Sequence, residues 1–599
     1  MHREHFFISI SSIYAKSINI PFDVDYMDTF YFGEKSIQLA WAGVHENPVI
    51  LYGERNISIG LGFFYCSNVS SKEEILKELF ERGNVTPAEI NGEFLLLSID
   101  KEDGSLVIYS DRFSSIQFHY SENSNGFIGA FSFSDIVVSK KAEKETLTWG
   151  DEEFYEYLNY RRIHGKYTLC KEIFFLRSGH LLRYTDRMFV ERYFAPKYEQ
   201  RKISHNTAAV WVAEALQASI SDKVSDAQSI SLFLSGGHDT RVVLAALNRD
   251  VRCYTVGFNA QTREILRARE LCDLIGVEHI PVVLEPDLYQ ETYLEAVLQN
   301  GGHYNVANIF LGLRDRVDAE SVGLCGTGLD YLFQGMYIPR NDVNFHDYTL
   351  FHTPQTISSD ISNFYLSSFS SRIKFPNINM LFRSDSIEDM RLALLHKIKY
   401  LEEEALEFGA NPLQAYHHLF LSDPSRHYSY PDNLAMRTLC KLRTPSFDNR
   451  VFDCYLQTDP LLRFDRRLVR DVLDILKPEF RRVLSANDDL PIVSSSRKLA
   501  YRALRKFRTS LFGKPEEKPM ETVRTWPTND TALKTTRQAQ QAIEILLDSQ
   551  NSGNLIDIVR LADLYRRWQH EPADCPNHTA DILWNIASVQ MFKQYLGGS

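Results

Sequence analysis

Residues 231–247 of this chain read Ser-Leu-Phe-Leu-Ser-Gly-Gly-His-Asp-Thr-Arg-Val-Val-Leu-Ala-Ala-Leu, and this stretch decides the fold. A short apolar run leads to two adjacent glycines, and apolar residues then return at helical spacing, which predicts a strand, a tight turn and a helix. Gly236 and Gly237 allow the backbone to come close to a ligand. The turn opens onto a helix N-terminus, which favours an anion such as phosphate. Asp239 lies in the first helical turn, where it could hold a metal ion bound to that phosphate.

The spacing of this loop differs from that of the two common phosphate-binding motifs. Neither G-x-G-x-x-G nor G-x-x-x-x-G-K-[ST] occurs here. The string S-G-G-x-D-T after an apolar strand instead resembles the pyrophosphate loop, S-G-G-x-D-S, of ATP pyrophosphatases that form an acyl-adenylate. The alternative is a plain strand-to-helix corner. A second matching segment downstream favours the phosphate loop.

Length and composition narrow the class of protein. A chain of 599 residues predicts two or three domains at ~150 residues each. The net charge of −12 argues against a body that binds nucleic acid. No apolar window is long enough for a membrane helix, and the N-terminus lacks a signal-peptide core. The eight cysteines are scattered without a C-x-x-C pair, which indicates reduced thiols in a cytoplasmic protein.

The first third of the chain reads as short strands joined by turns. Apolar runs at 94–99 and 106–109 flank a polar D-K-E-D-G stretch, and a second pair of runs, at 118–120 and 127–131, flanks a polar turn. Short helices are expected at 73–82 and 152–161. We therefore expect a strand-rich, two-sheet domain with helical cover over residues 1–196.

Several segments of this region resemble a known family. Asn91-Gly-Glu-Phe94 and Ser110-Asp-Arg-Phe113 resemble the G-x-F and R-D-R-F-G segments of glutamine amidotransferases of the N-terminal nucleophile type. Residues 166–173 and 178–180 resemble the stretch that closes that domain in asparagine synthetases. With the loop at 235, the chain resembles the asparagine synthetase B-type family and its relatives, β-lactam synthetase, carbapenam synthetase and lasso-peptide cyclase. The resemblance implies an α+β N-terminal nucleophile-type β-sandwich, followed over 200–599 by an α/β parallel-sheet ATP pyrophosphatase domain.

One departure from the family concerns the amidotransferase nucleophile. Glutamine-hydrolysing members carry a cysteine directly after the initiator Met, with its own α-amine as base. Here that position is His2, and the first cysteine is Cys66. Because a thiolate nucleophile needs that geometry, we expect a domain that no longer releases ammonia from glutamine. The alternative is a true start elsewhere, with a Cys-bearing leader.

A second informative string lies at 321–335, Ser-Val-Gly-Leu-Cys-Gly-Thr-Gly-Leu-Asp-Tyr-Leu-Phe-Gln-Gly. An apolar strand again runs into a glycine turn, which includes Gly326, and an acid follows at Asp330. The string resembles S-G-E-G-S-D-E-x-F-G-G of the family, which implies that Asp330 and Asp239 share Mg²⁺ at the phosphates of ATP. Seen alone, Asp330 could equally be a helix N-cap.

Between the two strings, strand and helix alternate at 251–258, 264–275 and 277–284. This alternation predicts a doubly wound parallel sheet, with ligands at the carboxyl ends of the strands. The resemblance implies that ATP binds there. The residues implied for the nucleotide are Leu234 and Phe258 on the adenine side, and Ser235, Gly236, Gly237, Thr240 and Gly326 around the phosphates.

The acceptor side of the site departs from asparagine synthetases. Thr327 stands where those enzymes carry Glu, Tyr331 stands where they carry a second acid, and Arg241 follows the first loop. The pattern favours retained adenylation chemistry with an altered substrate. A polar, aperiodic stretch near 345–385 predicts an insertion or lid over the site. Arg443, in a segment that helps wall the substrate pocket in relatives, is either a bidentate carboxylate or phosphate ligand or an ordinary ion pair.

The C-terminal part supplies the remaining candidates. In the family a lysine from this part approaches the α-phosphate; Lys498 is the candidate here and Arg497 the second, and a merely solvated basic helix is the alternative. Glu402, Glu403, Glu404 and Glu407 are expected on a solvated helix face. Residues 514–530 are expected to form a linker, and 532–547, 555–568 and 584–595 closing helices.

These features predict a ligase that adenylates a carboxylate with ATP and Mg²⁺ and passes it to an amine, without its own glutaminase. The substrates would be small-molecule or peptide carboxylates and amines, with an amine in the same molecule as the first choice. Asparagine synthesis from aspartate, dependent on glutamine or ammonia, is the second reading. A catalytically silent scaffold is the third. Neither nucleic acid nor membrane is expected as a partner, whereas a homodimer or a pathway-partner protein is compatible.

Overall fold

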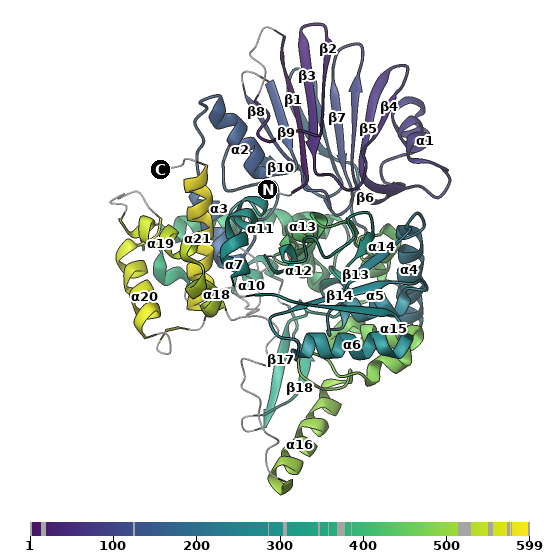
Figure 1. Cartoon of the computed structure of the whole chain (residues 1–599), viewed down its shortest axis with the longest axis vertical. Helices are drawn as coiled ribbons and strands as arrows, with labels where there is room; N and C mark the ends of the chain where they lie inside the picture. Colours follow the sequence, from purple (N-terminus) through teal and green to yellow (C-terminus); the bar gives the residue numbers. More distant parts are fainter. Residues whose placement is uncertain are drawn as a thin grey trace.

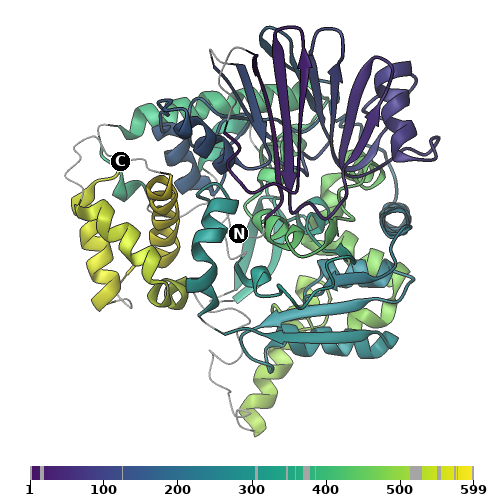
Figure 2. The ribbon, with the colours of Figure 1, turned by 45° about the horizontal axis from the view of Figure 1, so that its top comes forward.

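The computed structural model describes residues 3–13, 19–123, 126–285, 287–303, 308–345, 348–357, 359–367, 378–384, 386–512, 529–548, 555–571, 575–576 and 578–596. A β-sandwich forms one end of the molecule, and a parallel sheet with its helices lies below it (Figure 1). A group of C-terminal helices lies at the side of both (Figure 2).

The sandwich consists of two antiparallel six-stranded sheets. The first has the order β10 (Phe174–Phe175), β8 (His119–Asn123), β9 (Gly126–Ala130), β1 (His5–Ser12), β3 (Lys35–Ala42) and β2 (Tyr26–Phe32). The second has the order β12 (Met188–Arg192), β11 (His180–Tyr184), β7 (Leu106–Ser110), β6 (Asn91–Asp100), β5 (Asn56–Tyr65) and β4 (Val49–Tyr52). The hairpins expected from the apolar runs are β6–β7 and β8–β9.

Side-chain alternation along the strands explains the layers of the sandwich. Leu95, Leu97 and Ile99 of β6 lie in the core between the two sheets, together with residues of β1 and β3. Phe94 and Leu96 point to the opposite face, into a smaller core beneath α1 (Lys72–Lys77). The remaining helices of this half are the π-helical turn η1 (Glu78–Arg82), α2 (Phe133–Ala142) and α3 (Asp151–Tyr160).

The chain leaves the sandwich after β12, and α4 (His205–Lys223) begins at an N-cap, Ser204, whose side chain accepts from the Thr207 N–H. Five parallel strands follow, in the order β15 (Glu278–Val283), β14 (Arg252–Gly257), β13 (Ile230–Phe233), β16 (Val322–Leu324) and β19 (Lys441–Arg443). β13 is the first of these in sequence and lies in the middle. The sheet therefore winds in both directions from β13, as the strand–helix alternation predicts. The expected division at 196–200 stays a prediction.

Helices surround this sheet. They are α5 (Asp239–Ala246), α6 (Arg263–Ile275), α7 (Leu288–Gln299), α8 (Asn308–Leu311), α9 (Leu329–Phe333), α10 (Ile361–Ser367), η2 (Ile378–Leu381), α11 (Ile387–Glu407), α12 (Pro412–Leu421), η3 (Pro424–Arg426), α13 (Pro431–Arg437), α14 (Asn449–Gln457), η4 (Pro460–Arg466), α15 (Arg467–Leu476), η5 (Pro478–Arg482) and α16 (Ser495–Phe512). Gly276 ends α6 in the left-handed conformation with φ +71°, as the sequence predicts.

The stretch expected to be an aperiodic insertion or lid is more regular than its composition indicates. Its first part belongs to the hairpin of β17 (Arg340–Phe345) and β18 (Tyr348–Pro354), and residues 361–367 form α10. Ile361 and Tyr365 of α10 are buried, so apolar anchors one turn apart stabilise a helix within a polar segment. Residues 368–377 lie outside the described part of the chain.

The C-terminal helices close the structure against both halves. They are α18 (Asn529–Thr535), α19 (Arg537–Asp548), α20 (Ile558–His570) and α21 (Thr579–Tyr595). The single helix expected at 532–547 is two helices, and the expected helix at 584–595 begins five residues earlier. Asn585 of α21 accepts a hydrogen bond from Tyr157 of α3, and Tyr293 of α7 pairs with Ser588 at 3.3 Å. Most of the expected linker at 514–530 lies outside the described residues.

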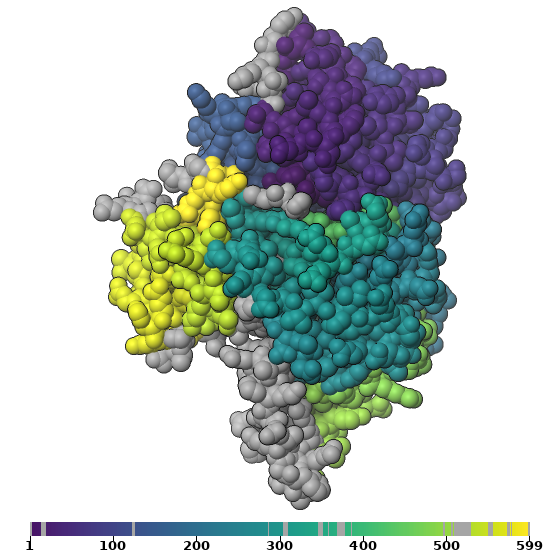
Figure 3. All heavy atoms as spheres, in the orientation of Figure 1, coloured from purple at the N-terminus to yellow at the C-terminus, as the bar shows by residue number. Residues whose placement is uncertain are grey.

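Figure 3 shows one continuous body, in which the sandwich rests on the lower half. Buried ion pairs lie at this junction. Arg177 of the sandwich donates to both oxygens of Glu404, at 3.0 and 2.9 Å, and to Asp423 at 3.0 Å. The expectation that Glu404 lies on a solvated face is therefore wrong, because the incoming sandwich covers that face of α11.

All eight cysteines are free. Among the described helices, none combines the length and the apolar character that crossing a membrane requires.

Candidate active site

The two glycine loops lie at the point where the winding of the parallel sheet reverses. β13 and β16 are neighbours in the sheet, and the chain winds outward from them in opposite directions; in open α/β sheets, ligands bind at the carboxyl ends of the strands at such a point. The loop 234–238 follows β13 directly, and the loop 325–328 follows β16. The fold thus brings together two segments that are about ninety residues apart in the sequence.

The first loop is tightened by hydrogen bonds among its own residues. The Ser235 N–H donates to the Thr240 hydroxyl at 2.9 Å, and the two hydroxyls lie 3.0 Å apart. The Gly237 N–H faces the Ser235 hydroxyl at 3.2 Å. Thr240 therefore holds the turn closed from the first turn of α5, a role that any hydroxyl side chain at this position could fill.

Arg241 fixes the same loop from beneath. It is fully buried, and its guanidinium donates to the carbonyls of Gly236, Phe480, Val483 and Leu484 at 2.7–3.1 Å. The Ala486 N–H also donates to the Gly236 carbonyl, at 3.1 Å. Arg241 was noted in the sequence as an acceptor-side departure. Its role in the structure is to hold the loop against residues 480–484 through these hydrogen bonds.

A carboxylate occupies one of the backbone donors predicted to hold phosphate. The Gly236 N–H donates to Glu264 of α6 in a short hydrogen bond. Burial raises the pKa of Glu264, while the Gly236 bond and Arg241 oppose that rise. Sequence reasoning missed this residue, because nothing in the pattern of α6 distinguishes Glu264 from its other charged residues.

The two loops touch, and glycine is required at the contact. A Cβ on Gly326 would lie 2.7 Å from the Thr240 backbone nitrogen and 2.8 Å from the Asp239 Cβ. Gly328 has φ +91°, and a Cβ there would lie 2.2 Å from the Ser446 hydroxyl. Any side chain at 326 would therefore push the two acidic loops apart.

Asp239 and Asp330 meet across this contact. Asp239 is half-buried; desolvation and the nearby charge of Asp330 raise its pKa to about 7, although Gln334 donates to its carboxylate and Arg466 attracts it. Asp330 lies in the first turn of α9, after the N-cap Gly328, so the N-cap reading of Asp330 is wrong. Two carboxylates that disfavour each other's charge form a site suited to a cation.

This pair fits magnesium rather than a metal held by protein alone. Within the described residues, no cluster of three or more His, Cys, Asp or Glu side chains is placed to bind a metal. An ion here would rest on two carboxylates together with phosphate oxygens and water. Mg²⁺ accepts such a set, because it dehydrates reluctantly and is commonly shared with substrate phosphates.

Cationic side chains surround the first loop. Burial and the charges of Arg466, Arg241 and Lys498 hold the pKa of His238 well below its ordinary value. Lys498 lies in α16 and pairs with Asp488 at 2.5 Å, while Arg497 is exposed. The structure thus brings Lys498 near the first loop. Arg466 also lies near it, and sequence reasoning missed this residue because it lies at an irregular turn, with φ +58°.

The two residues assigned to the adenine side have different surroundings. Leu234 continues the sheet, since its N–H donates to the Tyr254 carbonyl and its carbonyl accepts from Thr255, both at 2.9 Å. Phe258 follows β14 and stacks on Tyr289 with ring centroids 5.7 Å apart. Their contact with a nucleotide stays a prediction.

The acceptor side is built from neutral groups. The Thr327 hydroxyl donates to the Asn433 amide oxygen at 2.5 Å, and Asn433 donates to Thr444 at 3.1 Å. Tyr331 is buried beside His427, with ring centroids 4.3 Å apart. The departures seen in the sequence therefore replace acids with an uncharged network.

Arg443 lies outside the site. It is buried, and it donates to both oxygens of Asp226, at 2.5 and 3.0 Å, and to Glu46 at 2.6 Å. Of the two interpretations of Arg443, the ion pair is thus correct. The substrate-ligand interpretation is wrong, because the guanidinium N–H groups already donate to two carboxylates.

The amidotransferase-like motif residues contribute to the junction between the two halves. Glu93 of the Asn91–Phe94 motif accepts from Lys223 at 2.9 Å, from Arg437 at 3.3 Å and from the Thr444 N–H. Asn91 accepts from the Asn449 N–H at 2.9 Å. His2, at the position of the family nucleophile, lies outside the described residues.

Comparison with known proteins places the chain in a family. Residues 211–592, more than half of its length, match the family described as asparagine synthase. Among solved structures, one titled as the allosteric regulatory enzyme of purine biosynthesis matches at 9% identity, with a TM-score of 0.20, over 56% of this chain and 70% of that one. Glutamine phosphoribosylpyrophosphate amidotransferase from B. subtilis matches at 12% identity, with a TM-score of 0.18, over 51% of this chain and 62% of that one.

At these TM-scores the two structural matches add nothing to the description of the fold. No curated protein matches the chain. The family match covers the parallel sheet and both glycine loops. The chain belongs to the asparagine synthase family.

Proposed function

We propose that the protein is an ATP-dependent ligase that adenylates a carboxylate and transfers the acyl group to an amine, forming an amide. The observation that carries the proposal is the meeting of Asp239 and Asp330 at the switch point of the sheet, where Asp239 has a pKa of about 7. Two carboxylates held close together disfavour each other's charge, and a cation bound between them would relieve that repulsion. Magnesium bound with ATP would be that cation.

In the proposed reaction, a carboxylate oxygen of the substrate attacks the α-phosphorus of ATP, and the bond to the bridging oxygen of pyrophosphate breaks. The amine nitrogen then attacks the acyl carbon, AMP leaves, and the nitrogen loses a proton. The Gly236 and Gly237 N–H groups and the Ser235 and Thr240 hydroxyls are the donors for the pyrophosphate oxygens. Asp239 and Asp330 would hold Mg²⁺, and the ion would supply neutralisation of phosphate charge and orientation of the leaving group.

Lys498 and Arg466 are the cations placed to stabilise the negative charge that develops at the phosphates. Both act on His238 of the phosphate loop, and Arg466 also acts on Asp239. Because Lys498 is paired with Asp488, it reaches phosphate only by exchanging that carboxylate for the ligand. Arg466 is therefore the second candidate for the charge-stabilising role, beside Lys498.

We infer further that the amine is not ammonia released by this chain from glutamine. Position 2 is His2 rather than a cysteine. Glu93, in the motif that resembles the amidotransferases, is engaged by Lys223 and Arg437 of the other half. The neutral surroundings of Thr327 and Tyr331 favour a substrate other than aspartate, with an amine-bearing small molecule or peptide as acceptor.

The test is pyrophosphate release from ATP with a panel of carboxylates, with and without added amines, and glutamate release from glutamine in parallel. The proposal expects carboxylate-dependent pyrophosphate release that Asp239→Ala abolishes and that Asp389→Asn, an exposed acid on α11, leaves unchanged. No release with any carboxylate, and no difference between wild type and Asp239→Ala, would favour a silent scaffold. Measurable glutaminase activity would refute the inference about ammonia.

A further inference from the structure

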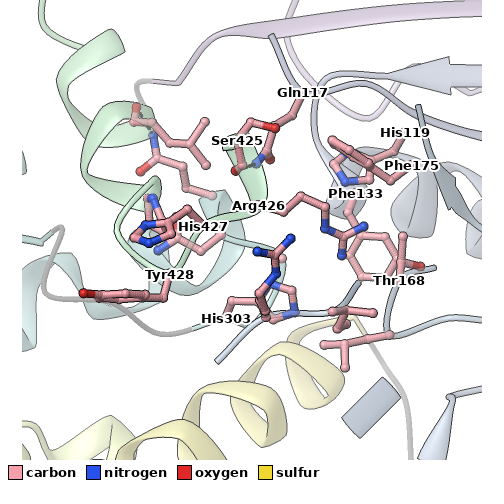
Figure 4. Close-up of a pocket in the computed structure, with 18 of the residues that line it drawn as sticks. Gln117, His119, Phe133, Thr168, Phe175, His303, Ser425, Arg426, His427 and Tyr428 are labelled. Carbon is pink, nitrogen blue, oxygen red and sulfur yellow. Dashed lines mark hydrogen bonds between the residues drawn. The ribbon is translucent and has the colours of Figure 1, made fainter. Parts of the chain in front are cut away.

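A cavity of about 70 Å³ lies between the sandwich and the lower half, beside the nucleotide loops rather than at them. Gln117, His119 and Phe175 line it from the sandwich, and His303, Arg426 and His427 line it from the other half (Figure 4). In Figure 4 the Arg426 side chain extends across the middle of the space, between His119 on one side and His427 on the other.

Two arginines of this cavity have no carboxylate partner. Arg162 is 3% exposed; its NH1 donates to the Phe420 carbonyl, while its Nε and NH2 have no hydrogen-bond partner among the residues that the structure describes. Arg426 donates to the carbonyls of Gly165 and Tyr167, at 3.2 and 2.7 Å. Within the described part of the chain, neither guanidinium forms an ion pair. Arg162 is buried and Arg426 is half-buried. A buried guanidinium normally pairs with an anion, so this arrangement leaves a place for one.

The nearby acids are already engaged by other cations. Glu156 accepts from Lys397 at 2.6 Å and from His164, and Asp423 pairs with Arg177 at 3.0 Å. The positive charge of the cavity comes from its arginines, because burial and the charge of Arg426 lower the pKa of His119 and of His303 to about 3. The cavity therefore has cationic donors and neutral histidines, and none of its described lining residues is an acid.

Further buried polar groups are unpartnered at the same place. Among the described residues, neither the Nδ2 nor the Oδ1 atom of Asn300 has a hydrogen-bond partner, and Asn300 is only 8% exposed. The Ser425 hydroxyl, 1% exposed, likewise has no partner in the described ranges. Each buried polar group without a partner costs about 1–3 kcal/mol, so several in one cavity indicate that a polar ligand completes them.

The cavity shares a wall with the nucleotide site. His427 stands against Tyr331, the residue after Asp330, and its Nε2 pairs with the Tyr337 hydroxyl. Tyr428, the next lining residue, lies 4.0 Å from the sulfur of Met336. A ligand in the cavity would therefore lie behind the helix that presents Asp330.

We propose that this cavity binds a small organic carboxylate, held by the forks of Arg162 and Arg426 and by the side chains of Asn300 and Ser425. A planar carboxylate matches the two parallel N–H groups of an arginine. The volume suits an acid of a few heavy atoms, since one water needs about 10–15 Å³ by the same measure. Because Asn300 offers an acceptor as well as donors, an acid that also carries a hydroxyl or ammonium group fits best. Binding requires neither ATP nor Mg²⁺, so the proposal goes beyond the ligase chemistry and does not depend on it.

The test is isothermal titration of the full chain, without nucleotide, with acetate, glycolate, glycine, succinate and inorganic phosphate at constant ionic strength. We expect saturable binding of at least one carboxylate, weakened at least tenfold in Arg162→Gln. The control Arg252→Gln removes an exposed arginine at the far end of β14 and should leave the binding unchanged. Arg162→Lys should bind more weakly than wild type, because it retains the charge but loses the fork.

Asn300→Asp keeps the side-chain shape and adds a negative charge, so it should abolish carboxylate binding while the melting temperature stays within a few degrees. This near-isosteric variant keeps the test decisive if Arg162→Gln fails to fold. Three results would overturn the proposal: no titratable binding of any carboxylate, which would mean a cavity that holds only water; binding of phosphate alone; or carboxylate binding that Asn300→Asp leaves unchanged.

Discussion

Two acids show how differently the two regions of the molecule treat charge. Glu93, buried at the junction of the halves, receives hydrogen bonds from Lys223, Arg437 and a backbone N–H. Asp239, at the start of α5, is half-buried and faces a second acid, and its pKa is raised to about 7. The junction places two cations around one acid, whereas the loop brings two acids together. The first arrangement is typical of a structural ion pair, and the second is typical of a functional site.

The largest effect is expected from removing the charge of either acid in the Asp239–Asp330 pair. Asp239→Asn and Asp330→Asn should each lower pyrophosphate release by about 10³-fold or more, because each removes one of the two proposed magnesium ligands. The same variants should leave the unfolding midpoint of the nucleotide-free protein unchanged or higher, since they relieve repulsion between like charges. Activity and urea denaturation measured on the same samples check both statements.

The opposite result would show that Asp239 does not differ in role from Glu93. If Asp239→Asn destabilised the nucleotide-free protein and left pyrophosphate release intact, the acid pair would be a structural feature like Glu93. Asp389→Asn, on the exposed face of α11, is the matched control for loss of one negative charge.

The next largest effect should come from removing the Glu93 carboxylate, which pairs with both Lys223 and Arg437. Glu93→Gln leaves the buried Lys223 ammonium and Arg437 without their shared anion, and removing one partner of a buried pair costs about 3–5 kcal/mol. The expected outcome is a fall in the free energy of unfolding of about 3 kcal/mol, read from urea denaturation with an unchanged slope. Glu388→Gln on the exposed surface of α11 serves as the control. A loss below about 1 kcal/mol would show that water replaces the carboxylate easily.

The sequence predicted the part of this contrast that is local. Strand, glycine turn and acid follow one another within a few residues at both loops, so the pattern at 231–247 and at 321–335 sufficed to place Asp239 and Asp330. The helix C-cap at Gly276 and the hairpin β6–β7 were equally local. Each of these features depends on neighbours in the chain, and periodicity and turn residues report such neighbours.

What the sequence did not predict depends on distant partners. Arg443 could not be assigned, because its anions are Asp226, 217 positions away, and Glu46, 397 positions away. Glu404 looked like one of four solvated acids until Arg177 of the sandwich covered it. Arg466 and Glu264 carry no motif, and only the tertiary path brings them to the phosphate loop. No periodicity encodes such encounters, so these residues were misread or missed.

A smaller effect concerns protons at the acid pair. The pKa of Asp239 is raised to about 7 from an ordinary value near 3.8, so the folded nucleotide-free protein binds a proton that the unfolded chain releases. Its contribution to stability is therefore present below about pH 4 and is lost as the pH rises through 7. Binding of Mg²⁺ with ATP should return the pKa toward its ordinary value and release about half a proton at pH 7.

Calorimetric titration of Mg²⁺·ATP in buffers of different ionisation enthalpy measures this release directly. Asp239→Asn should remove the release, whereas the exposed-acid control should keep it. Proton uptake in place of release would mean that the ion does not contact Asp239.

The smallest effect tests the Gly236 N–H, a donor of the first loop that a carboxylate accepts from. The Glu264 carboxylate accepts from the Gly236 N–H, where a phosphate oxygen is expected to bind, so the two anions compete. Glu264→Gln removes the charge and should tighten pyrophosphate binding by about three- to tenfold at pH 8, as measured by calorimetry. Because burial raises the pKa of Glu264, the gain should shrink as the pH falls and the wild-type carboxylate takes up a proton.

Glu270→Gln, which changes an exposed acid on the same helix, is the control. If Glu264→Gln instead weakened pyrophosphate binding at every pH, then the carboxylate would orient the Gly236 N–H rather than compete for it, and Glu264 would belong with Glu93 on the structural side of the comparison.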